Sequence, residues 1–376
     1  MMTSAEKDEH YMRLALAEAR RALGRTSPNP CVGALIVKDH RIIASGYHHK
    51  AGTPHAEVHA LAAAGEQASG ATMYVTLEPC NHTGKTPPCS HAVVKSGIAR
   101  VVIGMLDPNP LVDGGGRQYL LDHSVEITSG ILERECRAIN EPFIKYITTG
   151  KPLLAIKAGL SLEGRLNYRK GRSGWITGPE SGEKVHQLRD YYDAILVGRT
   201  TVEIDDPSLT TRLSQGSGHD PVRLLLDTRL SIAPSAKILH LRSEAQTWIF
   251  CGPDAPLEKE KTLRQMGAMV FRTATDTAGM LDLHEIVKLL GSKNITSVLI
   301  EGGGRIFSSF LNSRLADKVH LFYAPLFAGS AGESMTPDLF VAERKSAVTL
   351  TDVEYTRLGD DVLLEGKLKY PKDGPT

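Results

Sequence analysis

Two stretches of the sequence decide its fold and function: His55-Ala56-Glu57 and Pro79-Cys80-Asn81-His82-Thr83-Gly84-Lys85-Thr86-Pro87-Pro88-Cys89. They place three good zinc ligands, His55, Cys80 and Cys89, close to one further carboxylate, Glu57, within residues 55–89. Three protein ligands leave a fourth tetrahedral position for water, and zinc lowers the pKa of that water to roughly 7. The pattern therefore indicates a catalytic zinc site.

The order of these residues is typical of zinc-dependent base deaminases, which carry His-x-Glu followed by Pro-Cys-x-x-Cys. Here residues 81–88 separate the two cysteines where the short pattern has two residues, so the loop between them is enlarged. Its His82 and Lys85 predict a loop that binds substrate while it delivers ligands. Because residues i and i+2 do not share a helix face, we expect His55 at a helix start, from which Glu57 can reach the metal-bound water.

Two simpler interpretations of the zinc window stay open at this point. The histidine and two cysteines could form a structural zinc knuckle, or bind no metal. Structural sites usually close the shell with a fourth cysteine or histidine and do not need an acidic residue two positions after the histidine. The carboxylate of Glu57 therefore favours the catalytic interpretation.

Length and composition set the outer limits. A chain of 376 residues is too long for one ordinary core, which predicts two domains. A helical stretch ending at Tyr146 is followed by small residues and a proline at Thr148-Thr149-Gly150-Lys151-Pro152. We therefore expect domains at residues 1–149 and 150–376.

The charge and cysteine pattern exclude several classes of protein. Lys and Arg number 44 against 43 Asp and Glu, which argues against a dedicated nucleic-acid binder. No apolar run approaches the ~20 residues needed to cross a bilayer, and residues 1–25 lack the apolar region of a secretory signal. Cys31, Cys136 and Cys251 remain as an odd number of cysteines whose spacing suggests no disulfide pattern. We expect a cytoplasmic protein that binds neither nucleic acid nor membranes.

Both halves alternate strands and helices. The first half predicts a helix before Gly24, then a hairpin around Asp39-His40 and a helix from His55 to Gly65. A strand over 72–77, a helix after Cys89 and a strand over 100–105 follow. The second half has apolar runs of strand length at 153–157, 194–198, 223–227, 247–251, 297–300 and 319–323. This alternation predicts α/β domains, the second with a substantial parallel sheet.

Two strand-to-helix junctions in the second half are rich in glycine. One is Gly198-Arg199-Thr200-Thr201 and the other is Glu301-Gly302-Gly303-Gly304-Arg305. Glycines at such a junction let backbone N–H groups approach a phosphate, although a glycine triplet alone is more often a tight turn. Neither matches the Gly-x-Gly-x-x-Gly fingerprint or a P-loop. Two of them in one sheet favour a dinucleotide.

Three other residues of the second half could contact ligands. Trp175 lies in a glycine-rich loop and could line a ring-binding site, while Arg189 and Arg212 could clamp a phosphate. Equally, the tryptophan could cover a core edge and either arginine could be a solvated surface residue. Taken one at a time, these residues do not decide between the alternatives.

Taken together, the motifs resemble the bifunctional riboflavin-biosynthesis deaminase/reductase family. The deaminase half is similar in Thr26 to Pro30 followed by Cys31-Val32-Gly33, in the zinc window and in Asp107-Pro108-Asn109-Pro110. The reductase half is similar in 157–165, Ser173 to Thr177, 205–210 and 301–304. The family usually has Asp where Glu163 stands, so the loop around it has a longer carboxylate. The combination of these motifs is specific for the family, although each single motif is less so. Together they cover nearly the whole chain and follow the order found in the family.

The resemblance implies a cytidine-deaminase-like α/β/α domain at 1–149 and a dihydrofolate-reductase-like α/β domain at 150–376. The first, with Zn2+, would remove the 2-amino group of 2,5-diamino-6-ribosylamino-4(3H)-pyrimidinone 5′-phosphate. The second would use NADPH to reduce the ribosyl chain, giving 5-amino-6-ribitylamino-uracil 5′-phosphate. A choice of NADPH over NADH does not follow from spacing. We also expect a homo-oligomer.

The resemblance also assigns roles to residues. It makes Glu57 the proton carrier and implies deaminase substrate contacts from Asn29, His48, His82, Lys85, Asp107 and Asn109. In the reductase, Lys157 and Glu301 would lie near the sugar carbon that accepts hydride. Substrate contacts would come from Ser173, Arg189, Leu209 and Arg212, and cofactor contacts from Gly159, Trp175, Arg199, Thr201, Asp205, Gly302, Gly303 and Gly304.

Two other functions, one enzymatic and one not, compete with this hypothesis. A nucleic-acid-editing deaminase with an RNA-binding second domain would explain the zinc window, yet it leaves the glycine junctions and the balanced charge unexplained. A zinc-stabilised interaction protein would have no turnover. Deamination of the free pyrimidine phosphate, and its loss on changing Glu57, would separate the three hypotheses.

Overall fold

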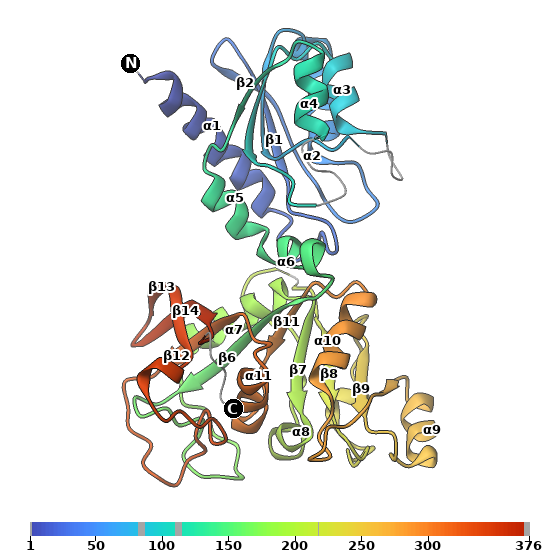
Figure 1. Ribbon diagram of the computed structural model, residues 1–376, viewed down its shortest axis with the longest axis vertical. Helices are drawn as coiled ribbons and strands as arrows, with labels where there is room; N and C mark the ends of the chain where they lie inside the picture. The colour runs from blue at the N-terminus through green and yellow to red at the C-terminus, as the bar shows by residue number, and fades with distance from the viewer. Residues whose placement is uncertain (1, 82–86, 110–114, 217, 372–376) are drawn as a thin grey trace. The chain divides into compact units, whose positions relative to one another are not determined.

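The computed structural model describes residues 2–81, 87–109, 115–216 and 218–371. The chain divides into two compact units, Met1–Gly150 and Lys151–Thr376. Each unit has its own sheet with helices packed against it (Figure 1). Among the described residues, no helix combines the length and the apolar character that a membrane span requires.

A mixed five-stranded sheet forms the centre of the first unit, in the order β2-β1-β3-β4-β5. Strand β1 pairs antiparallel with β2 and β3, whereas β3, β4 and β5 run parallel. The expected hairpin is confirmed, since Asp39 and His40 both have positive φ, 49° and 61°, as in a type I′ turn. The strands are β1 (Gly33–Lys38), β2 (Arg41–Tyr47), β3 (Thr72–Leu77), β4 (Arg100–Met105) and β5 (Glu126–Ser129).

The helices of this unit cover both faces of the sheet. A Cβ on Gly33 of β1 would lie 2.1 Å from the Ala15 carbonyl oxygen in α1, and one on Gly46 of β2 would lie 2.6 Å from the Ala56 carbonyl oxygen in α2. These glycines point to opposite faces, because Gly46 pairs with the residue after Gly33. The helices are α1 (Ser4–Arg20), α2 (Ala56–Ala64), α3 (Cys89–Lys95), α4 (Gly115–Asp122), α5 (Glu133–Ile139) and α6 (Glu141–Thr149), with a 3-10 turn at Gly65–Ala68.

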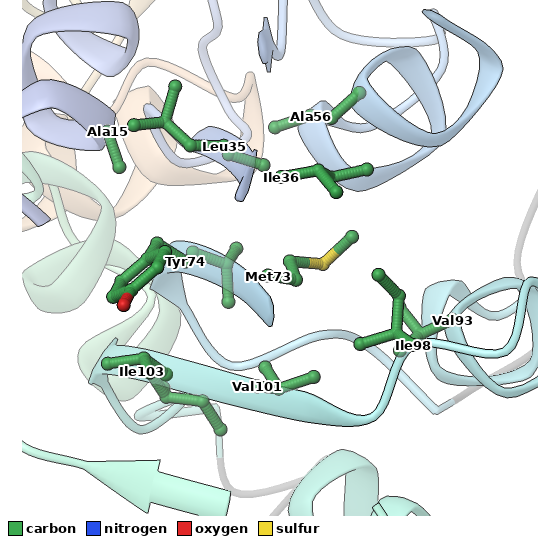
Figure 2. Packing of buried hydrophobic residues seen from close by; sticks show 14 of the residues in the cluster. Ala15, Leu35, Ile36, Ala56, Met73, Tyr74, Val93, Ile98, Val101 and Ile103 are labelled. Atoms are coloured by element: carbon green, nitrogen blue, oxygen red, sulfur yellow. The ribbon is translucent and has the colours of Figure 1, made fainter. Parts of the chain in front are cut away.

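Apolar side chains fill the space on either side of β1, β3 and β4 (Figure 2). Leu35, Met73 and Val101 lie in this core and are almost completely buried. A buried ion pair fixes α1 to the sheet, since Asp8 accepts hydrogen bonds from Arg100 at 2.9 and 2.7 Å and from the Tyr74 hydroxyl at 2.9 Å. The short elements that carry the zinc ligands therefore start from a rigid sheet.

The second unit is built on a nine-stranded sheet in the order β10-β9-β8-β7-β11-β6-β12-β14-β13. The strands from β10 to β12 are parallel, and β14 and β13 add an antiparallel hairpin at the far edge. The strands are β6 (Leu153–Leu160), β7 (Ala194–Gly198), β8 (Val222–Leu226), β9 (Thr247–Cys251), β10 (Met269–Arg272), β11 (Ser297–Ile300), β12 (Lys318–Tyr323), β13 (Thr349–Leu358) and β14 (Asp361–Lys369).

Helices again lie on both faces of this sheet. Leu154 and Ile156 of β6 pack in one cluster with residues of α10 and α11, whereas the intervening Ala155 packs with residues of α7. The next residue of the same parity, Lys157, therefore projects to the α7 face. The helices are α7 (Pro179–Tyr191), α8 (Arg199–Asp205), α9 (Leu257–Gln265), α10 (Leu283–Ser292) and α11 (Gly304–Asn312), with 3-10 turns at Lys237–Leu239 and Arg344–Ser346.

The predicted alternation of strands and helices is confirmed, with two differences. Strand β6 continues to Leu160 instead of ending at Lys157. The antiparallel pair β13 and β14, and the edge strands β5 and β10, were not predicted. Strand β13 is exposed along nearly its whole length and lacks the apolar run by which strands are recognised in a sequence. It forms a strand because its backbone pairs with the neighbouring strand β14.

Candidate active sites

Two of the three predicted zinc ligands lie at helix starts in the first unit, and the third follows a strand. His55 occupies the position before α2, with extended backbone (φ −75°, ψ 166°), and Cys89 is the first residue of α3. Cys80 follows β3, three residues after Leu77. The sequence prediction of ligands at two helix starts is confirmed. Each helix directs partial positive charge toward the thiolates.

The donor atoms of this cluster fit a zinc ion. The Nδ1 atom of His55 lies 3.2 Å from Sγ of Cys89 and 3.5 Å from Sγ of Cys80, and all three donor atoms lie within 4.8 Å of one another. A tetrahedral site with Zn–N of about 2.0 Å and Zn–S of about 2.3 Å has N···S edges of about 3.5 Å. Among the described residues, this is the one group of three or more His, Cys, Asp or Glu placed to hold a metal ion.

Glu57 lies beside the cluster in the first turn of α2, and its side chain is buried, with the residue 3% exposed. Burial, together with the neighbouring Cys80 sulfur, raises the pKa of its carboxyl group to about 7. The hydrogen bonds that Cys80 accepts from Cys89 and His55 lower the pKa of its thiol to about 4. A buried carboxyl group that titrates near neutrality is suited to carry a proton.

Other residues predicted for this site lie on the loops around it. The Nε2 atom of His48 lies 3.1 Å from Nδ2 of Asn29, and its ring packs edge-on to that of His55 at 5.3 Å between centroids. Burial lowers the pKa of His48. Asp107 follows β4, and its Oδ1 atom accepts a hydrogen bond from the Asn109 amide at 2.9 Å. His82 and Lys85 lie outside the described residues.

Sequence reasoning missed Glu78, which organises this edge of the sheet. Its buried carboxylate accepts hydrogen bonds from the Asp107 amide at 3.2 Å and from the Arg117 amide at 2.8 Å. The loop after β4 and the start of α4 are thereby held against the segment that carries Cys80. An acidic residue directly after the buried strand Thr72–Leu77 was the available signal.

The central group of the second unit joins three residues that are far apart in sequence. Glu301, directly after β11, accepts two hydrogen bonds from Arg189, both at 2.8 Å, and one from Nζ of Lys157 at 3.4 Å. All three side chains are largely buried. Although burial opposes ionisation, the two cations lower the pKa of Glu301 to about 2, and burial lowers the pKa of Lys157.

Both glycine-rich junctions occur at the carboxyl ends of parallel strands, where α/β sheets bind ligands. Gly198 precedes α8 and Gly303 precedes α11. A Cβ on Gly303 would lie 4.0 Å from Oγ1 of Thr201, so the two junctions are neighbours. A Cβ on Gly304 would lie 2.2 Å from the Ser334 carbonyl oxygen, so only glycine lets the loop around Ser334 approach. Arg199 pairs with Glu203 on α8.

The remaining predicted residues lie in loops, on β6 and at the end of α8. Leu209 is buried with positive φ (52°), and Arg212 donates from Nη1 to the Thr210 hydroxyl at 3.0 Å. Thr210 also accepts a hydrogen bond at its carbonyl from Arg189 at 3.2 Å, a link that the sequence did not suggest. Trp175 is 64% exposed in a loop. Gly159 lies on β6, Asp205 ends α8, and Ser173 lies in the exposed loop before Trp175.

Glu163, the residue that departs from the usual aspartate, holds a neighbouring loop. Its Oε1 atom accepts hydrogen bonds from the amides of Ala328 and Gly329, both at 2.6 Å. The Leu162 amide bonds the Leu326 carbonyl at 2.9 Å beside it. The longer side chain therefore bridges the loops that follow β6 and β12.

Two family models match the chain. The cytidine and deoxycytidylate deaminase zinc-binding region matches residues 5–105, and the RibD C-terminal domain matches residues 152–364. The riboflavin biosynthesis protein RibD of Bacillus amyloliquefaciens is 39% identical over 371 residues, which cover 98% of both chains. RibD of Aquifex aeolicus is 41% identical over 359 residues, which cover 96% of this chain and 98% of its own.

Solved structures agree with these matches. RibD of Acinetobacter baumannii superimposes with a TM-score of 0.86 at 36% identity, covering 97% of this chain and 100% of its own. A Thermotoga maritima diaminohydroxyphosphoribosylaminopyrimidine deaminase/5-amino-6-(5-phosphoribosylamino)uracil reductase has a TM-score of 0.83 at 35% identity, covering 98% and 100%. The expected deaminase-like and reductase-like folds are thereby confirmed. The chain belongs to the family of bifunctional riboflavin-biosynthesis enzymes, which deaminate a pyrimidine ribose phosphate with the help of zinc and then reduce its ribosyl chain with NADPH.

Proposed function

We propose that residues 1–149 carry the deamination and residues 150–376 the reduction, each with its own set of catalytic residues. The observation that carries this proposal is the cluster of His55, Cys80 and Cys89, whose donor atoms lie within 4.8 Å of one another beside the buried Glu57. The second unit has a different polar centre at Lys157 and Glu301. The division is supported because each centre is built from residues of one unit.

In the deaminase, His55, Cys80 and Cys89 would hold Zn2+. When bound, this ion makes a water molecule acidic enough to serve as the nucleophile near neutral pH. Glu57 would take a proton from that water and pass it to the departing ammonia, a role supported by its buried position beside the three ligands. The substrate would be oriented by Asn29, His48, His82, Lys85, Asp107 and Asn109.

In the reductase, NADPH supplies the hydride, and the protein orients the sugar against it. Lys157 would donate a hydrogen bond to the sugar beside the carbon that is reduced, while Glu301, itself held by Arg189, keeps the lysine in place. Ser173, Leu209 and Arg212 would complete the substrate contacts around Arg189. The cofactor would be bound by Gly159, Trp175, Arg199, Thr201, Asp205, Gly302, Gly303 and Gly304.

A Glu57→Gln variant tests the deaminase proposal. It keeps the size of the side chain and removes its capacity to carry a proton, so ammonia release should fall by about 10²–10⁴-fold with zinc content unchanged. Glu66→Gln, at an exposed position of the same unit, is the matched control. Full deamination by Glu57→Gln would refute the assigned role.

A Lys157→Ala variant tests the reductase proposal and the division of labour. NADPH oxidation, followed at about 340 nm, should be lost while ammonia release persists. The exposed Lys293→Ala is the control in the same unit. Loss of both activities in a folded Lys157→Ala protein would show that the two centres do not act independently.

We also infer a homo-oligomer in the cytoplasm. The edge strand β13 supports self-association, because it exposes Val353 and Tyr355 on an unpaired sheet edge. The five cysteines form no disulfide, which supports a reducing compartment. Light scattering on the purified chain tests the first inference, and a monomer at micromolar concentration would refute it.

A further inference from the structure

A buried polar cluster in the second unit has no part in the mechanism proposed above. His320, on β12, is 3% exposed. Its Nε2 atom lies 2.8 Å from the Tyr192 hydroxyl and its Nδ1 atom lies 2.6 Å from Oε1 of Glu365. Ionisable groups are rarely buried without a reason, because burial disfavours their charged forms.

The sheet register places this cluster next to the reductase centre. His320 is the paired neighbour of Lys157 on β6 and of Glu365 on β14. Paired residues of adjacent strands project from the same face of the sheet, so Lys157, His320 and Glu365 form one row.

Helix α7 lies over the same row. Arg189, near the end of α7, holds Glu301, and Tyr192, which follows the helix, contacts His320. The last turn of α7 and the residue that follows the helix therefore each contact one of the two groups. The polar centre at Lys157 and the cluster at His320 are therefore adjacent and share one covering helix.

The hydrogen bonds specify which nitrogen of His320 carries the proton. The Glu365 carboxylate can only accept, so Nδ1 donates to it, and Nε2 of the neutral ring accepts from the Tyr192 hydroxyl. The hydrogen bond from His320 lowers the pKa of Glu365 despite the opposing effect of burial, which keeps that carboxylate ionised. The Tyr192 hydroxyl can also accept from Nε2–H of a protonated ring and so satisfies either form, whereas the Glu365 carboxylate stabilises the charged one.

We propose that His320 is a positioning residue of the reductase, which acts through Lys157 by remaining uncharged beside it. The proposal rests on the role assigned to Lys157 above. With His320 neutral, Glu301 lies between the two cations Lys157 and Arg189. Protonation of His320 adds a further positive charge next to Lys157, which lowers the affinity of Lys157 for its own proton and weakens its ion pair with Glu301.

The groups that face His320 favour its neutral form on balance. Lys157 approaches from β6, Lys184 from α7 and Lys318 from its own strand, while Glu365 faces it from β14, with Glu354 beyond on β13. Burial, the largest influence, and the nearby lysines lower the pKa of His320, whereas Glu365 opposes them. The imidazole of His320 is therefore protonated only at a pH below the range in which histidine usually titrates. Reductase activity should fall at that lower pH.

A single-atom change in the partner of Nδ1 should move this loss of activity along the pH scale. Glu365→Gln removes the charge that favours the protonated ring, so the acid limb of the reductase pH profile should move down by about one pH unit. Tyr192→Phe removes a hydroxyl that can pair with either form of the ring, so the limb should move less in this variant. A role confined to packing would leave the limb of Glu365→Gln where it is in the wild type.

The experiment measures kcat and KM of the full chain with NADPH and the deaminated substrate from about pH 5 to 8. The His320→Gln variant should lose the acid limb while its KM for NADPH and its ammonia release stay unchanged, and the exposed His284→Gln serves as control. If His320→Gln does not fold, Glu365→Gln alone tests the proposal. An acid limb of Glu365→Gln that stays unchanged or moves up would overturn it.

Failure of this proposal can be distinguished from failure of the proposed function. If Lys157→Ala retains NADPH oxidation, the role of the lysine is wrong and His320 has nothing to act through. If Lys157→Ala is inactive but Glu365→Gln leaves the pH profile unmoved, only the inference about His320 is overturned.

Discussion

The two candidate active sites are assembled in different ways. The proposed zinc ligands His55, Cys80 and Cys89 lie within one short window, at two helix starts and in the segment after a strand. The proposed reductase centre instead joins Lys157 of β6, Arg189 of α7 and Glu301 after β11, which are up to 144 residues apart in sequence. Local spacing therefore reveals the first site, whereas the second forms only when the sheet does.

The difference extends to how each site is stabilised. In the first unit a metal ion would neutralise the two thiolates, and the surrounding sheet positions the ligands. In the second unit charges on the chain itself balance, with two cations around one carboxylate. Removing zinc and removing Glu301 should consequently have different effects, the first on chemistry and the second on folding.

The largest expected effect is the response to a chelator. Without Zn2+ no acidic water is available, so ammonia release should fall by more than about 10³-fold, and added zinc should restore it. NADPH oxidation on pre-deaminated substrate should be unaffected, because the described second unit has no metal-ligating cluster. Parallel assays of both activities on one chelated sample check this. If NADPH oxidation fell as much as ammonia release, the conclusion that only the first site depends on zinc would be wrong.

Next in size is the effect of Glu301→Gln on stability. The variant leaves Lys157 and Arg189 buried beside a neutral amide, which should cost about 3–5 kcal/mol of the free energy of unfolding. Both tryptophans, Trp175 and Trp248, lie in the second unit, so their fluorescence during denaturation reports on that unit. Glu258→Gln, which breaks an exposed pair with Lys261, is the control and should change stability by well under ~1 kcal/mol.

The smallest expected effect is the acid sensitivity of the second unit. The pKa of Glu301 is held at about 2, below the ordinary 4.5, so its ionisation stabilises the folded state above pH 4.5. This contribution, about 3 kcal/mol, should be lost as the pH falls from 4.5 toward 2. Tryptophan fluorescence during denaturation at several pH values measures it. The same stability in Glu301→Gln and wild type at pH 2, but not at pH 6, would identify Glu301 as the source.

Much of the first site could be predicted from sequence. The order of His55, Glu57, Cys80 and Cys89, the hairpin at Asp39-His40 and the strands β3 and β4 all follow from motifs and apolar runs. These features depend on contacts that are local in sequence or on patterns with a fixed period. Glu78 was missed because its partners, the amides of Asp107 and Arg117, are remote in sequence.

Sequence alone determined the nature of the chain: two α/β domains, a three-ligand zinc window and two glycine-rich junctions, because residue type and spacing limit which atoms can bind a metal or admit a phosphate. Only the tertiary structure decided that Arg189 holds Glu301, and that His320 stands beside Lys157. The physical reason is strand order. In the sheet, β11, β6 and β12 are neighbours although long segments separate them in the chain, and no local pattern encodes which strands will pair.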